Sequence, residues 1–207
     1  IREALDSIIN QTYNNLEIII IDDGSTDKSV EIVKSYNDSR IRLIQNECNK
    51  GIPYTRNLGL KKAKGKYMAI MDSDDISYST RIERQVEFME KNNEVDVVGS
   101  FYEIFGYKKS KTVKAKYVFP DELAIFFLFS NGICNSTALV RLDTIRNNNI
   151  TYNNNYFVAQ DYDFWTQVSK IGKLQIIPEV LVKYRTGHEN ITNLSFSKKS
   201  IERFKII

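Results

Sequence analysis

Three carboxylates stand within four residues, directly after a short apolar run. The run covers residues 68–71, and Asp72, Asp74 and Asp75 follow it. An apolar run that ends abruptly in polar residues is typical of a strand buried on both faces. In open α/β sheets, ligands bind outside the carboxyl ends of such strands. A divalent cation that prefers oxygen ligands would neutralise the cluster, although a solvated acidic loop is the better interpretation of such a cluster taken alone.

A second acidic turn follows an earlier apolar run. Residues 16–21 are rich in β-branched side chains, which favours a core strand, and Asp22 and Asp23 come directly after it. A helix with apolar residues at helical spacing, a strand over 41–44 and a helix over 52–63 lead to the strand at 68–71. This order predicts a βαβαβ unit with a parallel sheet. Because neighbouring parallel strands end at the same edge, we expect the two acidic turns to form one site.

The remaining sequence predicts elements that complete one α/β domain over residues 1–207. The expected helices cover 80–91, 120–129 and 160–171, and the expected strands cover 95–105, 136–140 and the extended segment 173–185. An Asn-rich loop covers 147–155, and a short amphipathic helix is expected over 195–207. The predicted fold is a Rossmann-like, mostly parallel central sheet flanked by helices.

The composition supports a globular domain with a substantial core. Of the 207 residues, 42% are hydrophobic and 12% aromatic, and the net charge of +3 is too small to argue for nucleic acid. Cys48 and Cys134 form neither a disulfide framework nor a zinc motif, which favours a reducing compartment. No apolar run approaches the ~20 residues that a membrane span needs.

Five lysines fall within nine positions in the middle of the chain: Lys108, Lys109, Lys111, Lys114 and Lys116. A solvated loop or edge strand is the more common explanation of such a run. The alternative is a patch that faces anionic lipid headgroups or a phosphate-bearing acceptor.

Taken together, five motifs make the chain resemble the inverting family-2 glycosyltransferases of the A-type fold. The motifs are Ile-Asp-Asp-Gly-Ser-Thr-Asp (21–27), Lys-Gly-Ile-Pro-Tyr-Thr-Arg-Asn-Leu-Gly-Leu (50–60), Met-Asp-Ser-Asp-Asp (71–75), Gln-Asp-Tyr-Asp-Phe-Trp (160–165) and Lys-Tyr-Arg-Thr-Gly-His (183–188). Each motif alone is weak, but their order and spacing over nearly all of the chain make a strong signal. The resemblance also implies a strand ahead of the first helix that supplies part of the nucleotide pocket, so the fold is expected here without its N-terminal strand.

The resemblance implies a donor site built from the first half of the chain. Asp74 would coordinate Mg²⁺ or Mn²⁺, and Asp72 would assist through the ribose or a metal-bound water. Asp23 resembles the carboxylate that hydrogen-bonds the nucleobase, usually uracil. Arg56 would reach the nucleotide or its phosphates, with a surface ion pair as the alternative. For Asp75, helix or loop capping is favoured.

The resemblance further implies a catalytic base and one more metal ligand. Asp161 would accept the proton of the attacking hydroxyl, and Gln160 stands before it where the family more often has Glu. His188 lies where family members donate a metal or pyrophosphate contact, with a structural role as the alternative. Trp165 would stack on an acceptor ring or fill the core, and the core is the commoner place for such a residue.

The expected function is transfer of a hexosyl or N-acetylhexosaminyl group, with inversion, from a nucleoside-diphosphate sugar. A UDP-sugar is the favoured donor, and the acceptor would be a saccharide or lipid-linked molecule in cell-surface polysaccharide synthesis. Residues 1–105 would bind the nucleotide, residues 106–190 the acceptor, and residues 191–207 would form a tail. We expect a cytoplasmic protein that makes a peripheral contact with the inner face of the plasma membrane. The alternatives are a non-catalytic nucleotide-sugar binding module and a sugar nucleotidyltransferase.

Overall fold

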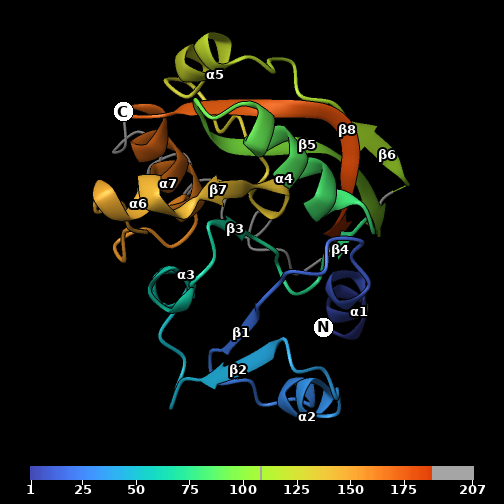
Figure 1. Cartoon of the computed structure of the whole chain (residues 1–207). Helices are drawn as coiled ribbons and strands as arrows, with labels where there is room; N and C mark the ends of the chain where they lie inside the picture. Colours follow the sequence, from blue (N-terminus) through green and yellow to red (C-terminus); the bar gives the residue numbers. More distant parts are fainter. Residues whose placement is uncertain (108, 188–207) are drawn as a thin grey trace.

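The computed structural model describes residues 1–107 and 109–187, and it confirms the α/β class with a curled central sheet flanked by helices (Figure 1). The first part of the chain forms α1 (Arg2–Ile9), β1 (Ile18–Asp22), α2 (Ser29–Lys34), β2 (Ile41–Gln45), α3 (Ile52–Lys62) and β3 (Tyr67–Ala69). These elements appear in the predicted order. At the start of α2, the Asp27 carboxylate accepts a hydrogen bond from the backbone N–H of Ser29.

The second part of the chain supplies most of the central sheet. Its elements are β4 (Ile76–Ser77), α4 (Arg81–Lys91), β5 (Val95–Gly106), β6 (Lys111–Val113), α5 (Pro120–Phe126), a 3₁₀ turn η1 (Asn135–Thr137), β7 (Leu139–Arg141), α6 (Leu142–Asn147), α7 (Gln160–Ser169) and β8 (Lys173–Thr186). The strand predicted over 136–140 is divided between η1 and β7, and α6 was not predicted. The expected helix over 195–207 lies outside the described residues.

The strand pairing differs from the mostly parallel sheet that the sequence predicts. β1 and β2 pair in parallel, but β3 belongs to a second sheet with the order β3-β7-β5-β8-β4 and β6 on β5. In that sheet β5 and β8 are parallel, whereas β3 runs antiparallel to β7. The apolar run over residues 68–71 correctly predicts a strand here. Its partner, however, comes from residues 139–141, and no local sequence pattern identifies that pairing.

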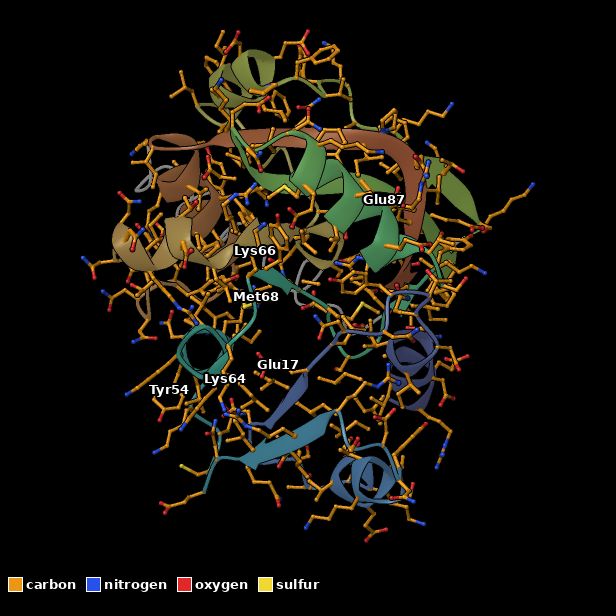
Figure 2. The ribbon with its side chains drawn as sticks, in the orientation of Figure 1. Glu17, Tyr54, Lys64, Lys66, Met68 and Glu87 are labelled. Atoms are coloured by element: carbon orange, nitrogen blue, oxygen red, sulfur yellow. The ribbon has the colours of Figure 1, made fainter. Side chains whose placement is uncertain are left out.

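A groove of about 850 Å³ separates β1 from β3 and is lined by both strands. In the described part of the chain β1 pairs with β2 alone and β3 with β7 alone, so each strand keeps one unpaired edge. Figure 2 shows Met68 of β3 and Glu17, next to β1, on the two sides of this space; the Glu17 carboxylate accepts hydrogen bonds from the backbone of Lys64 and Gly65. The groove therefore lies between two unpaired strand edges.

The main core lies around β5, β8 and α7. Trp165 is completely buried there, and its ring contacts Phe164 edge-on, which confirms its expected place in the core. Close packing explains the glycine at position 99 in β5, because a Cβ there would lie 2.8 Å from side-chain atoms of both Ile133 and Ile176. Within the described ranges, no helix combines the length and hydropathy of a membrane span.

Candidate active site

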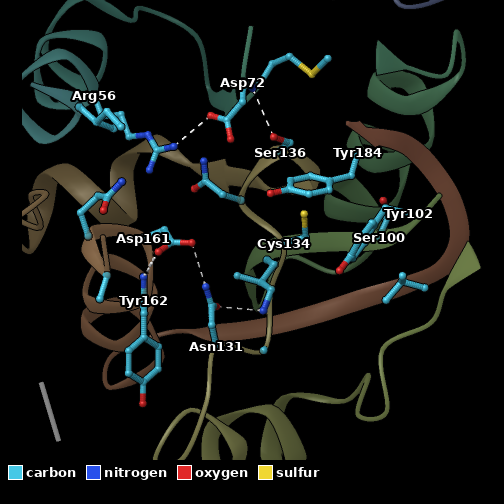
Figure 3. Close-up of a pocket in the computed structure, with 18 of the residues that line it drawn as sticks. Arg56, Asp72, Ser100, Tyr102, Asn131, Cys134, Ser136, Asp161, Tyr162 and Tyr184 are labelled. Carbon is cyan, nitrogen blue, oxygen red and sulfur yellow. Dashed lines mark hydrogen bonds and ion pairs between the residues drawn. The ribbon is translucent and has the colours of Figure 1, made fainter. Parts of the chain in front are cut away.

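A pocket of about 1030 Å³ collects the candidate residues from both halves of the chain (Figure 3). Asp23 follows β1, Arg56 comes from α3, Asp72 and Asp74 follow β3, and Asp161 opens α7; all five line this pocket. The convergence predicted for the two acidic turns is therefore observed, although β1 and β3 lie in different sheets. His188 lies outside the described residues.

Arg56 and Asp72 form an ion pair at one wall of the pocket. The Arg56 Nη2–Asp72 Oδ1 distance is 3.0 Å, and the guanidinium lies 5.4 Å from the centre of the Tyr152 ring. Burial of Arg56 opposes its charge, but the neighbouring Asp72, Tyr152 and Asp161 outweigh burial and raise its pKa. Arg56 therefore keeps its charge, and its ion pair with Asp72 lies at the pocket wall, whereas the alternative interpretation had placed an ion pair of Arg56 on the open surface.

Asp23 holds the loop that precedes α3. Its carboxylate accepts hydrogen bonds from the Asn46 side chain (2.8 Å) and from the backbone N–H groups of Lys50 (2.9 Å) and Gly51 (2.8 Å). Partial burial would raise the pKa of Asp23, but these hydrogen bonds outweigh it and hold the pKa below its ordinary value. Asp23 is thus an ionised carboxylate of fixed orientation at the pocket wall.

The acidic loop after β3 is fixed to the end of β8. The Asp75 carboxylate accepts a hydrogen bond from the backbone N–H of Arg185 (2.8 Å), and the Arg185 Nε donates to the Asp74 carbonyl (2.7 Å). Burial raises the pKa of Asp75 to about 7. The expected helix- or loop-capping role of Asp75 is wrong, because its carboxylate joins the acidic loop to a strand that is distant in sequence.

Asp72 and Asp74 differ in environment. Asp72 is paired with Arg56, and its backbone N–H donates to Ser136 Oγ at 3.4 Å. Asp74 has an exposed side chain at the pocket, where partial desolvation by the loop and the charge of Asp72 raise its pKa. A cation placed between the two carboxylates would relieve this repulsion.

Arg81 supports the acidic loop from behind. Its buried guanidinium donates to the carbonyls of Ile70 (2.9 Å) and Ala138 (3.2 Å) and to the Ser77 hydroxyl (2.9 Å). Burial lowers the pKa of Arg81 to about 10, so the side chain remains charged at neutral pH. Because Ile70 lies just before the acidic loop and Ala138 just after η1, Arg81 fixes the two segments side by side.

Replacing Arg81 with Met is expected to lower the free energy of unfolding by about 3–5 kcal/mol, because the substitution removes three buried hydrogen bonds and takes the Arg81 donor from the Ile70 carbonyl. Urea unfolding followed by circular dichroism measures this loss. Arg84→Met is the matched control, since Arg84 lies one turn away in α4 and forms an exposed ion pair with Glu179; its effect should stay within about 1 kcal/mol. Equal losses of unfolding free energy in the two variants would contradict the role of Arg81 in holding the Ile70 and Ala138 segments together.

Asp161 lies at the start of α7, and its carboxylate is hydrogen-bonded by Asn131, a contact that the sequence did not predict. The Asn131 amide donates to Asp161 Oδ2 at 3.1 Å, and the backbone N–H of Tyr162 donates to Oδ1 at 2.8 Å (Figure 3). Asn131 belongs to the loop between α5 and η1. This loop falls within residues 106–190, which were expected to bind the acceptor, but the sequence offered no local signal for its contact with α7.

Other lining residues come from the central sheet and η1, among them Ser100, Tyr102, Cys134, Ser136 and Tyr184. The rings of Tyr102 and Tyr184 meet edge-on, with centroids 5.8 Å apart. Burial raises the pKa of the Cys134 thiol, so it stays protonated. This side of the pocket therefore carries hydroxyl groups and aromatic surface rather than charge.

The donor atoms present suit a hard cation that is shared with a bound ligand. The described residues contain no group of three or more His, Cys, Asp or Glu side chains able to hold a metal ion by themselves. Mg²⁺ and Mn²⁺ accept one or two carboxylates and complete their shell with phosphate oxygens and water. Asp72 and Asp74, two neighbouring carboxylates on a large pocket, match that requirement.

The fold and the pocket define an enzyme-like α/β domain, and sequence comparison gives its family. Residues 1–166 match the model of glycosyl transferase family 2, and the chain belongs to this family. It is 38% identical over 218 residues to an uncharacterized glycosyltransferase of Haemophilus influenzae, covering 100% of this chain and 67% of the relative. It is also 30% identical over 200 residues to WfgD of Escherichia coli, named as a UDP-Glc:α-D-GlcNAc-diphosphoundecaprenol β-1,3-glucosyltransferase, covering 96% of this chain and 76% of WfgD.

Solved structures confirm the A-type glycosyltransferase fold. TarS 1–349 of S. aureus in complex with UDP superposes with a TM-score of 0.78 at 20% identity, covering 99% of this chain and 59% of TarS. The mannosyltransferase PcManGT of Pyrobaculum calidifontis in complex with GDP-Man and Mn²⁺ gives a TM-score of 0.70 at 18% identity, covering 92% of this chain and 54% of PcManGT. The chain thus spans 67% of the H. influenzae relative and a little over half of these two solved structures.

Proposed function

We propose that this chain carries the catalytic site of a metal-dependent, inverting glycosyltransferase. The donor would be a nucleoside-diphosphate sugar, with UDP-sugars favoured, and the acceptor a saccharide or lipid-linked molecule in cell-surface polysaccharide synthesis. The observation that carries the proposal is that the Asp72–Asp74 pair and Asp161 line one pocket from separate segments. The activity for which WfgD is named and the UDP bound to TarS support this choice of donor and acceptor.

In this proposal the first half of the chain, residues 1–105, binds the donor. The fixed Asp23 carboxylate would accept from the ring N–H of uracil, and Arg56 would face the phosphates. Asp74, assisted by Asp72, would hold Mg²⁺ or Mn²⁺, with His188 as a further candidate ligand. A bound ion supplies positive charge to the diphosphate that leaves the sugar.

The second half of the chain, residues 106–190, would bind the acceptor and remove its proton. Inversion requires one in-line displacement, in which the acceptor hydroxyl attacks the anomeric carbon opposite the leaving group. Asp161 would accept the hydroxyl proton, and the hydrogen bond from Asn131 would hold its carboxylate toward the pocket. The aromatic and hydroxyl surface of Tyr102 and Tyr184 is suited to a sugar ring.

Incubation with UDP-glucose or UDP-N-acetylglucosamine, Mn²⁺ and a lipid-diphosphate-linked sugar tests the proposal. We expect release of UDP and a product whose new linkage is β when the donor is α, as measured by NMR. Donor binding without transfer would favour the non-catalytic binding module. Formation of pyrophosphate from a sugar phosphate and a nucleoside triphosphate would identify a nucleotidyltransferase instead.

A further inference from the structure

Large exposed apolar side chains gather on and beside α5. Phe119 is 59% exposed, Ile125 63%, Leu128 52% and Phe129 74%, and these four residues are named here the α5 patch. They are half of the eight large hydrophobic residues that are exposed in the described part of the chain. The opposite side of α5 is well packed, since Leu123 and Phe127 are each 1% exposed. Helix α5 is therefore firmly seated and presents an apolar outer face, a feature that marks interaction sites.

A row of lysines leads into the α5 patch. Lys109, Lys111, Lys114 and Lys116 are all exposed, and none of them forms an ion pair within residues 1–107 and 109–187. The acidic side chains close to this segment are Asp121 and Glu122, in the first turn of α5, and Glu103 of β5, which accepts a hydrogen bond from Ser110. The four lysines outnumber these three carboxylates, so the segment keeps a positive balance. Apolar side chains flanked by basic residues match the chemistry of an anionic bilayer surface, where basic residues meet lipid headgroups and apolar residues enter the interface.

The α5 patch borders the acceptor side of the pocket. Phe126 and Lys116, which lie within this region, also line the pocket, and Asn131, which follows the patch, contacts Asp161. Figure 1 shows α5 at the opposite end of the molecule from β1, β2 and α2. A partner or membrane in contact with α5 would thus lie beside the pocket and away from the sheet formed by β1 and β2.

We propose that the α5 patch, together with Lys109, Lys111, Lys114 and Lys116, docks the enzyme on a bilayer that contains anionic lipids. The inference rests on the proposed function, because docking at this place would bring the diphosphate and sugar of a lipid-linked acceptor to the pocket while its lipid tail stays in the bilayer. It assigns the membrane contact to a particular helix and gives the pocket an orientation toward the membrane.

Flotation of the full chain with lipid vesicles tests the docking proposal. We expect binding to vesicles that contain phosphatidylglycerol, much weaker binding to phosphatidylcholine alone, and loss of binding at high salt. Leu128→Ser combined with Phe129→Ser should weaken binding about tenfold or more, as should Lys111→Glu combined with Lys114→Glu. The matched controls are Tyr54→Ser, an exposed aromatic on α3, and Lys61→Glu with Lys62→Glu, exposed lysines on the same helix; these should bind like the unchanged chain.

Three outcomes would overturn the docking proposal. The first is failure of the unchanged chain to bind either vesicle, and the second is equal binding by patch and control variants. The third is a dimer, measured by sedimentation velocity, that dissociates when the patch is altered, because the patch would then contact a second copy rather than lipid. Calorimetric titration with UDP and Mn²⁺ separates this test from the proposed function, because patch variants should keep their UDP affinity, and absence of UDP binding with intact docking would contradict the donor site alone.

Discussion

Replacement of Asp161 by Asn should reduce sugar transfer by about a thousandfold and leave donor affinity unchanged. The substitution keeps the shape of the side chain at the start of α7 but removes the group that would accept the hydroxyl proton, and general-base catalysis contributes about 10²–10⁴ in rate. The measurement is UDP release with saturating donor and acceptor, paired with calorimetric titration of UDP. Full activity in this variant would contradict the assignment of the base.

Asp163→Asn is the matched control for that experiment. Asp163 lies two positions away on α7 and is not among the residues that line the pocket; its carboxylate accepts a hydrogen bond from Gln167 Nε2 at 2.7 Å. An amide can accept the same hydrogen bond, so transfer should change only severalfold. If Asp161→Asn and Asp163→Asn lost equal activity, the effect would belong to the folding of α7 rather than to proton transfer.

Replacement of Asp74 by Ala should weaken UDP binding about 100-fold in Mn²⁺, which corresponds to about 2.7 kcal/mol. Asp74 is the exposed carboxylate of the acidic loop, so its removal deletes a cation ligand without opening a buried cavity. Titration of UDP with Mn²⁺ and then with EDTA measures the effect. The unchanged chain should lose most of its affinity in EDTA, and the variant should bind equally weakly in both.

Asp143→Ala controls for the loss of one negative charge. Asp143 is exposed in the first turn of α6 and does not line the pocket, so UDP binding should be unaffected. A parallel titration with GDP tests whether the site prefers uracil, the base whose ring N–H Asp23 is proposed to bind. Metal-independent UDP binding in the unchanged chain would contradict the role of Asp72 and Asp74, and tighter binding of GDP would contradict the favoured base.

Much of the site could be predicted from the sequence, because its parts are local. The carboxylates directly follow apolar runs, as Asp22 and Asp23 do in one turn and Asp72, Asp74 and Asp75 in the other. A strand that ends in an acidic turn can therefore be recognised from the sequence alone. In the first acidic turn, the Asp22 carboxylate accepts a hydrogen bond from the Ser25 backbone N–H, and the Asp27 carboxylate accepts one from the Ser29 backbone N–H. Five of the six candidate residues lie within the described chain, and all five line one pocket.

The residues that hold those carboxylates could not be predicted, because they are distant in sequence. Asn131 meets Asp161 across 30 positions, Arg81 joins Ile70 to Ala138, and Asp75 binds the backbone of Arg185 across 110 positions. Each contact depends on which strands become neighbours, and hydrophobic periodicity gives the type of an element but not its partner.

The sequence by itself therefore determined the order of the elements up to β3, the family and the carboxylates at the strand ends. Only the tertiary structure decided that β3 pairs with β7 rather than beside β1, that a groove separates β1 from β3, and that α5 presents an apolar outer face. The physical reason is that local propensity and burial pattern act over a few residues. Strand pairing and surface exposure are instead settled by the packing of the whole chain.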